Sequence, residues 1–177
     1  DGRFSLFREN AYFSNPHEIK LNAGGLVRGK KFLISTGSQV RVPPIPGLSK
    51  VNYKTSDDVL NLNQVPEECI VLGGGVVACE LAQFLSRVGS KVTILQRSVR
   101  LMMNFPPEAS KALEAQFKAE GIKVRTGVRL EQFYEIASNR VEIKCTIGNE
   151  VEKVSTGFLF LALGRIPNLN SKDMGVL

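Results

Sequence analysis

Three consecutive glycines, Gly73 to Gly75, have the residue types and spacing of a phosphate-binding turn. Lacking a Cβ, Gly73 allows the chain to turn sharply, and Gly75 allows its backbone to come close to a pyrophosphate. Ala78 takes the third small position, where a helix must pack closely on a strand. The start of that helix presents unpaired N–H groups and the positive end of its dipole to the phosphates. The pattern predicts dinucleotide binding; the alternative is a glycine-rich turn of some other α/β protein.

The elements expected around the glycines have the order that such a site requires. A short apolar strand is expected over 69–72, and a β-branched strand over 91–95. Between them, apolar residues recur at helical spacing up to a stop at Gly89: Val77, Leu81, Leu85 and Val88. Strand, glycine turn, helix and strand form the first βαβ unit of a dinucleotide-binding fold.

The remaining elements are expected on both sides of this unit. Ahead of it we expect one or two strands over 4–13, a meander, a strand over 31–35, a proline-rich connector over 43–47, and a short helix that Thr55 and Asp58 open as a capping box. After it we expect a helix from Pro106 with a stripe of Ala109, Leu113 and Phe117, strands over 122–125 and 158–163, and a three-stranded meander over 129–137, 140–147 and 150–154.

Composition narrows the class of protein. With 177 residues and 43% hydrophobic content, the chain can bury a core as one domain with appendages. Its net charge of +6 is spread along the sequence, which favours a solvated basic surface over nucleic-acid binding. No apolar run reaches membrane-spanning length and no signal peptide is recognised, so a cytoplasmic protein with buried, reduced Cys69, Cys79 and Cys145 is expected. The start at Asp1 rather than Met suggests that the chain is a piece excised from a longer protein. The single histidine, His17, is expected in an exposed turn.

Three stretches in a fixed order resemble the flavin-dependent pyridine nucleotide–disulfide oxidoreductases, among them dihydrolipoamide dehydrogenase, glutathione reductase and mercuric reductase. The stretches are STGSQVRVPPIPG at 35–47, VLGGGVVACELAQFLSRVGSKVTIL at 71–95 and ALGRIPN at 162–168. The resemblance implies an α/β fold in which a Rossmann-like NAD(P)-binding domain spans 51–163, with a parallel sheet, helices and a three-stranded antiparallel meander. Partial FAD-domain segments would flank it at 1–50 and 164–177. It further implies that the redox cysteine pair, the rest of the FAD domain and the dimerisation domain of a homodimer lie outside this chain, which alone would be inactive.

The resemblance also implies roles for individual residues. Pyrophosphate and nicotinamide contacts would come from the turn and helix start, and contacts near FAD from Thr36 and Gly37 and from a second turn between the two cofactors. The first set is Gly73, Gly74, Gly75, Val76, Val77 and Ala78, and the second turn is Ala162, Leu163 and Gly164. Glu80 would lie near the nicotinamide and flavin rings; spacing alone favours a solvated helix residue there. For the turn at Thr36 and Gly37 and for the turn at 162–164, the alternative is an ordinary crossing between domains. Val76 departs from the aromatic residue or Ile that the family often has beside the nicotinamide.

The residues after the second strand bear on the choice between NADPH and NADH. Gln96 stands where an NAD-preferring site places an acidic residue for the ribose hydroxyls, and it has no charge to repel a 2′-phosphate. Arg97 follows, as in NADPH-dependent relatives, and Ser98 and Arg100 could add donors. Because the guanidinium fork suits a phosphate, NADP is favoured over NAD; the alternative is that both arginines are solvated surface charges.

The resulting hypothesis is the NAD(P)-binding domain of an FAD-dependent NAD(P)H:disulfide-type oxidoreductase, which passes hydride to FAD and on to a disulfide or a metal ion. One alternative is an FAD-dependent NAD(P)H oxidase or a quinone or CoA-disulfide reductase. The other is a non-catalytic NAD(P)-sensing module. The two stretches that flank the central domain argue against the sensor, because a free-standing module does not need parts of an FAD domain.

Overall fold

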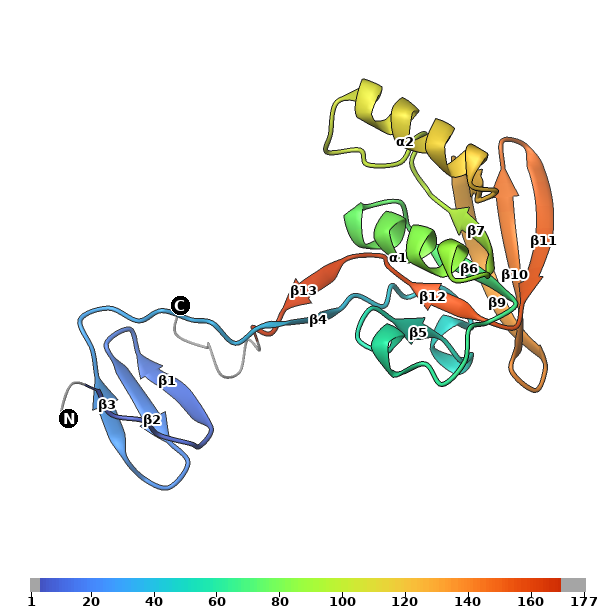
Figure 1. Cartoon of the computed structure of the whole chain (residues 1–177). Helices are drawn as coiled ribbons and strands as arrows, with labels where there is room; N and C mark the ends of the chain where they lie inside the picture. The colour runs from blue at the N-terminus through green and yellow to red at the C-terminus, as the bar shows by residue number, and fades with distance from the viewer. Residues whose placement is uncertain (1–3, 170–177) are drawn as a thin grey trace. The chain divides into compact units, whose positions relative to one another are not determined.

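A five-stranded parallel sheet is the centre of the larger of two compact units in the computed structural model, which describes residues 4–169 (Figure 1). This unit consists of residues 40–165. Its strand order is β5 (Lys54–Thr55), β12 (Leu159–Leu161), β6 (Glu68–Leu72), β7 (Lys91–Leu95) and β8 (Lys123–Arg125). The helix α1 (Val76–Arg87) connects β6 to β7, and α2 (Pro107–Ala119) lies between β7 and β8. The predicted βαβ unit is therefore confirmed.

A three-stranded antiparallel meander follows β8: β9 (Val128–Ala137), β10 (Arg140–Ile147) and β11 (Glu150–Thr156). The predicted three-stranded meander is confirmed, with turns at 138–139 and 148–149. Asn139 and Gly148 adopt positive φ there, a conformation that Asn and Gly tolerate best. α1 and α2 cover one face of the parallel sheet and the meander covers the other (Figure 1).

The central strands alternate between two apolar cores. In β6, Cys69 and Val71 pack with the helices, whereas Ile70 and Leu72 pack with the meander. Both faces are buried, which explains why this strand is a continuous apolar run rather than an alternating one. Phe117 of α2 is fully buried in the helix-side core, and burying a side chain of this size stabilises the fold by about 1.5–3 kcal/mol.

The predicted helix faces were partly wrong. The face of α1 against the sheet consists of Ala78, Cys79, Leu81, Ala82 and Leu85, while Val77 and Val88 are exposed. Small residues on that face allow the helix backbone to approach the strands closely, and this turns Val77 outward. In α2, Ala109 is exposed and its neighbour Ser110 is buried. The fold tolerates a buried serine here because its hydroxyl donates a hydrogen bond to the carbonyl oxygen of Leu101 at 2.7 Å.

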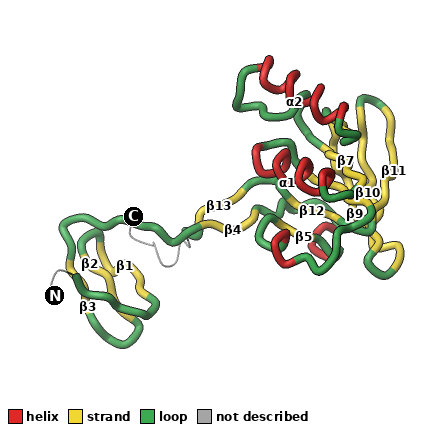
Figure 2. Tube along the Cα trace, viewed as in Figure 1, coloured by secondary structure: helices red, strands yellow, loops and turns green. Residues whose placement is uncertain are grey.

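Two short 3₁₀ turns lie near β5: η1 (Leu48–Lys50) and η2 (Val59–Asn61), drawn in red in Figure 2. The Asp58 carboxylate accepts hydrogen bonds from the Thr55 backbone N–H at 2.8 Å and from its hydroxyl at 2.9 Å. The predicted capping pair therefore exists, but it opens a single 3₁₀ turn rather than an α-helix.

The other unit contains the residues up to Gln39 together with those from Ile166 on. Its antiparallel sheet is formed by β1 (Ala11–Asn15), β2 (Glu18–Leu21) and β3 (Leu26–Arg28). Residues 4–10 and 31–35, predicted as strands, are irregular. Within the described part of the chain the sheet uses only these three strands, so the 31–35 run has no ladder partner and Leu33 is 92% exposed. His17 lies in the exposed turn, as expected.

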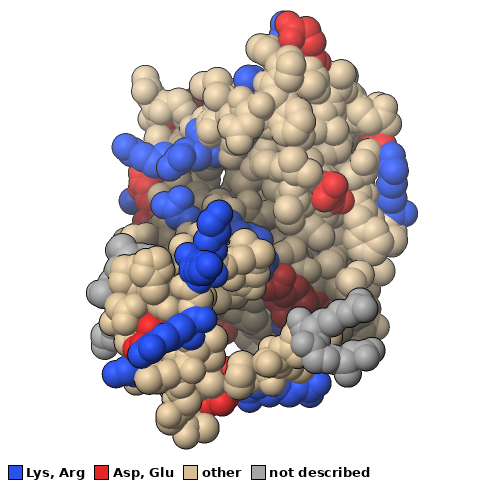
Figure 3. Space-filling view, turned by 90° about the vertical axis from the view of Figure 1, so that its left-hand side faces the viewer, with Lys and Arg blue, Asp and Glu red and all other residues tan. Residues whose placement is uncertain are grey.

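Where the chain passes between the units, β4 (Ser38–Val40) pairs with β13 (Arg165–Pro167). Among residues 4–169, no helix has the length and apolar character needed to cross a membrane. On the face drawn in Figure 3, basic side chains occur in separate groups rather than in one continuous patch.

Candidate functional site

The glycine turn lies at the point where the strand order reverses. The chain runs from β6 through β7 to β8 on one side, whereas β12 and β5 lie on the other. The carboxyl ends of β6 and β12 therefore flank the same crevice, which is the place where open α/β sheets bind ligands. Gly73 follows β6 and Ala162 follows β12, and the two residues are in contact.

The first two glycines are required by the fold itself. Gly73 has φ +115°, and a Cβ at this position would collide with the carbonyl oxygen of Ala162. A Cβ on Gly74 would lie 2.8 Å from Cδ of Gln96 and from a methyl carbon of Leu101. Both positions therefore need glycine for packing, whether or not a ligand binds.

Gly75 differs from its two neighbours. Its φ of −83° is ordinary for any residue, and a Cβ built on it would meet no described atom within 4 Å. The space beside this residue is open, so the fold alone does not explain the glycine. A pyrophosphate against the backbone would explain it, because a Cβ would occupy the place of the phosphate.

The N-terminus of α1 begins at this open space. Gly75 is the N-cap residue and has no side chain to cap the helix, and no described residue accepts a hydrogen bond from the N–H groups of Val76, Val77 or Ala78. Unbonded N–H groups and the helix dipole favour an anion. The turn therefore fits the pyrophosphate of a dinucleotide.

A cleft of about 620 Å³ extends from the glycine turn along the carboxyl ends of the strands. Residues predicted for the site from three separate stretches line it: Gly73, Gly74, Gly75, Val76, Val77, Gln96, Arg97, Ser98, Ala162, Leu163 and Gly164. The turn after β12 is tied to its neighbours by backbone hydrogen bonds, from Ala162 N to the Leu72 oxygen and from Arg41 N to the Gly164 oxygen, both at 2.9 Å. The topology therefore brings these stretches together into one surface.

One end of the cleft is formed by the residues after β7. Gln96 is partly buried, and its side-chain amide donates to the Arg100 carbonyl oxygen at 3.4 Å. Arg97 is exposed, and its guanidinium makes no hydrogen bond or ion pair with any described residue. It is therefore free to bind an anionic ligand.

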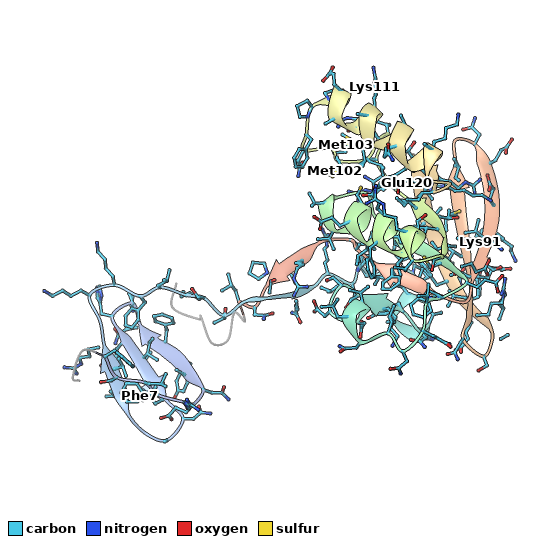
Figure 4. All side chains as sticks on the ribbon, in the orientation of Figure 1. Phe7, Lys91, Met102, Met103, Lys111 and Glu120 are labelled. Carbon is cyan, nitrogen blue, oxygen red and sulfur yellow. The ribbon has the colours of Figure 1, made fainter. Side chains whose placement is uncertain are left out.

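Arg100 lies elsewhere, although the sequence suggested it as a further phosphate donor. Its guanidinium donates to the carbonyl oxygens of Met102 and Met103, both at 3.0 Å, and to the Ser110 hydroxyl at 2.6 Å. The same loop reaches the glycine turn through a hydrogen bond from Met102 N to the Gly74 oxygen at 2.7 Å. Met102 and Met103 lie on this loop ahead of α2 (Figure 4). Arg100 thus holds the loop in place and does not line the cleft.

Four predicted residues do not line the cleft. Ala78 is buried on the face of α1 that packs against the sheet, in keeping with its predicted packing role. Glu80 is exposed on α1 without a described partner, as its spacing favoured. Thr36 and Gly37 belong to the smaller unit, where the Thr36 hydroxyl donates to the Asn168 oxygen at 2.8 Å and Asn168 N donates to the Gly37 oxygen at 2.9 Å.

Sequence reasoning missed several basic residues of the cleft. Arg41, Arg129 and Arg165 line it together with Arg97. Arg165 is paired with Asp57 at 3.1 Å, and the Arg41 side chain has no described partner. None of the three belongs to the glycine fingerprint. Arg41 and Arg165 lie in the two stretches that flank the central domain, whereas Arg129 lies in no motif and is brought to the site by the tertiary fold alone.

The cysteines do not take part in the cleft. All three are buried free thiols, as expected, and no group of His, Cys, Asp and Glu within residues 4–169 could hold a metal ion. Burial raises the pKa of Cys69 to about 12 and that of Cys79 to about 11. Both therefore stay protonated near neutral pH and are poor nucleophiles.

Comparison with known proteins relates this arrangement to a large group of enzymes. The profile of the pyridine nucleotide-disulphide oxidoreductases matches residues 2–177. The chain is 35% identical to the mercuric reductase of Staphylococcus aureus over 98% of its own length and 32% of that protein, and 36% identical to that of Bacillus cereus over 99% of its own length and 28% of that protein. It thus spans about a third of the length of these relatives.

A solved structure of a flavoprotein disulfide reductase has a similar fold. The HOCl-induced flavoprotein disulfide reductase RclA from Escherichia coli superposes with a TM-score of 0.80 at 26% identity, covering 98% of this chain and 40% of that one. Its Cu(II) complex superposes with a TM-score of 0.82 at 25% identity.

Proposed function

Because the chain belongs to the pyridine nucleotide-disulphide oxidoreductases, we propose that residues 40–165 bind NADPH within a longer flavin-dependent enzyme. The observation that carries the proposal is the open space at Gly75, where a Cβ would meet nothing described and unbonded helix N–H groups begin. Residues 51–163 would be the NAD(P)-binding domain, and the segments on either side would be parts of the FAD domain.

Different residues of the cleft would contact different parts of the two cofactors. The N–H groups at Gly75 to Val77 would hold the pyrophosphate, and Ala162 to Gly164 would form the wall between nicotinamide and flavin. Glu80 would face the two rings, and Thr36 with Gly37 would pass close to FAD. When bound, the nicotinamide supplies a hydride and the flavin accepts it, so the chain's task is to hold and orient the two rings.

Preference for NADPH over NADH would come from the end of β7. Gln96 has no negative charge to repel a 2′-phosphate, and the guanidinium of Arg97 is exposed and unpaired among the described residues. A charge-assisted hydrogen bond contributes about 1.5–3 kcal/mol, or roughly 10- to 100-fold in affinity.

The test is isothermal titration of the full-length protein with NADP⁺ and NAD⁺. We expect the wild type to bind NADP⁺ more tightly and Arg97→Ala to lose most of that preference, with its NAD⁺ affinity unchanged. Arg140→Ala is the matched control, because Arg140 pairs with Glu68 at 3.2 Å and does not line the cleft. Full NADP⁺ affinity and preference in Arg97→Ala would contradict the role of Arg97.

The electron acceptor would be a disulfide or a metal ion, in line with the relatives named mercuric reductase and the solved disulfide reductase. The three cysteines of this chain are all buried, so the redox pair would belong to another part of the full-length homodimer. NADPH oxidation by the full-length protein in the presence of Hg(II), lipoamide or glutathione disulfide tests this. Oxidation of NADPH by oxygen or a quinone alone would favour an oxidase or quinone reductase instead.

A further inference from the structure

A second arginine reaches the same end of the cleft from another strand. Arg129 follows the first residue of β9 and lines the cleft together with Arg97. Backbone hydrogen bonds join the start of β9 to the segment after β7, from Val128 N to the Gln96 oxygen and from Gly127 N to the Ser98 oxygen, both at 2.9 Å. The fold therefore holds Arg97 and Arg129 on adjoining segments.

Arg129 is held only at its tip. Its guanidinium contacts the Glu131 carboxylate at 3.1 Å, and its side chain is 75% exposed. Glu131 has two other partners: the Thr146 hydroxyl donates to it at 2.6 Å, and the Lys144 ammonium lies 3.2 Å away. Hydrogen bonds from Thr146 and Lys144 are the main reasons why the pKa of Glu131 is lowered, and Arg129 contributes less.

This cluster has a spare positive charge. Arg129 and Lys144 carry one positive charge each and Glu131 carries one negative charge, so the group has a net charge of +1. If Arg129 turns away, Glu131 still has a cation and a hydroxyl donor and is not left unpaired. An exposed ion pair of this kind contributes at most about 1 kcal/mol, so a phosphate can compete for the guanidinium.

We propose that Arg129 is a second phosphate-binding residue, which leaves Glu131 and donates to the 2′-phosphate of NADPH alongside Arg97. The inference rests on the proposed function and deepens it. A phosphate monoester carries about 1.5–2 negative charges near neutral pH, which two guanidinium groups neutralise better than one. Arginine offers only donors, which suits a phosphate better than a ribose hydroxyl that must also donate.

The experiment compares two ligands that differ only in the 2′-phosphate and cannot reduce a flavin: 2′,5′-ADP and 5′-AMP. Each is titrated calorimetrically into the full-length protein and its variants. We expect Arg129→Gln to weaken 2′,5′-ADP binding about tenfold and to leave 5′-AMP binding within twofold. Arg129→Lys should recover part of the loss, and the control Arg140→Gln should bind both ligands as the wild type does.

Two results for Arg129→Gln overturn the proposal. One is unchanged binding of both ligands. The other is equal weakening of both, which would mean that Arg129 stacks on the adenine base that the two ligands share. If that variant does not fold, Glu131→Gln decides, because release of Arg129 should tighten 2′,5′-ADP binding; unchanged or weaker binding overturns the proposal. Failure of the proposed function is distinct, since the wild type would then bind neither ligand, or would bind 2′,5′-ADP no more tightly than 5′-AMP.

Discussion

Replacing Gly75 by Ala separates the demands of the ligand from those of the fold. The new methyl group meets no described atom within 4 Å, and φ is −83°, so no strain is introduced. Gly→Ala at such a site gains about 0.4–1 kcal/mol from the unfolded chain. Ala is a poorer N-cap than Gly by a few tenths to about 1 kcal/mol. The two effects offset each other, so the free energy of unfolding should change by less than about 1 kcal/mol.

Binding of the dinucleotide should respond far more strongly. The methyl group occupies the space proposed for the pyrophosphate and keeps it from the helix N–H groups. Loss of one charge-assisted hydrogen bond costs about 1.5–3 kcal/mol, so NADP⁺ affinity should fall at least roughly tenfold. Urea unfolding and isothermal titration of the full-length protein measure the two quantities separately.

Two further glycine variants calibrate this result. Gly73→Ala should destabilise the protein, by about 1–3 kcal/mol for the backbone conformation alone, because φ is +115° and the methyl group collides with the Ala162 carbonyl oxygen. Gly157→Ala lies away from the cleft and has its nearest described contact at 3.9 Å, so it should raise the free energy of unfolding by no more than about 1 kcal/mol and leave NADP⁺ affinity unchanged. Our account of the turn is refuted if folded Gly75→Ala binds NADP⁺ within twofold of the wild type.

Three other predictions concern the scaffold around the site. Arg100→Ala should lower the free energy of unfolding by about 1.5–3 kcal/mol, measured in urea, without changing the NADP⁺ to NAD⁺ preference; a lost preference would mean that Arg100 binds phosphate. Hydrogen bonds, chiefly from Arg87, lower the pKa of Glu120 from 4.5 to about 2, so its stabilisation is present above pH 4.5 and is lost as the pH falls toward 2. Glu120 bridges the ends of α1 and α2 (Figure 4), and Glu120→Gln should flatten that pH dependence in acid-unfolding curves; a wild-type slope would disprove it. The pKa of Cys69 is about 12 and that of Cys79 about 11, so iodoacetamide at pH 8 should modify neither thiol while the protein is folded. Peptide mass mapping measures this, and labelling of Cys79 in the folded protein would contradict its burial.

Local patterns predicted the elements well where a backbone conformation marks their ends. β6 ends at Gly73, α1 at Gly89, and β9 and β10 at the turns that contain Asn139 and Gly148; all four residues adopt positive φ. Few residue types tolerate that conformation, so the sequence itself marks these boundaries. The strand expected over 31–35 does not form, although Gly37, two residues after it, also adopts positive φ. Its apolar residues satisfied a pattern, but a strand also needs a ladder partner, which depends on residues distant in sequence.

The arginines show why the site was harder to predict than the fold. Arg97 and Arg100 stand three positions apart and are chemically identical, yet one lines the cleft and the other is bound to a loop. What separates them is Ser110, which comes from the following helix and accepts a hydrogen bond from Arg100 alone. Arg129 comes from a strand that no nucleotide motif includes, and a pair of backbone hydrogen bonds brings it to the same end of the cleft.

The three glycines of the turn look equivalent in sequence, but they are glycine for different physical reasons. Gly73 is fixed by its φ and by the Ala162 carbonyl, and Gly74 by the side chains of Gln96 and Leu101. Only at Gly75 does no contact within the described chain require a glycine. A fold that needed glycine merely to turn would require the first two and would accept Ala at the third, because nothing in the described chain fills that space. The excess of one glycine beyond what packing requires is therefore the strongest physical argument in this structure for a ligand at the turn.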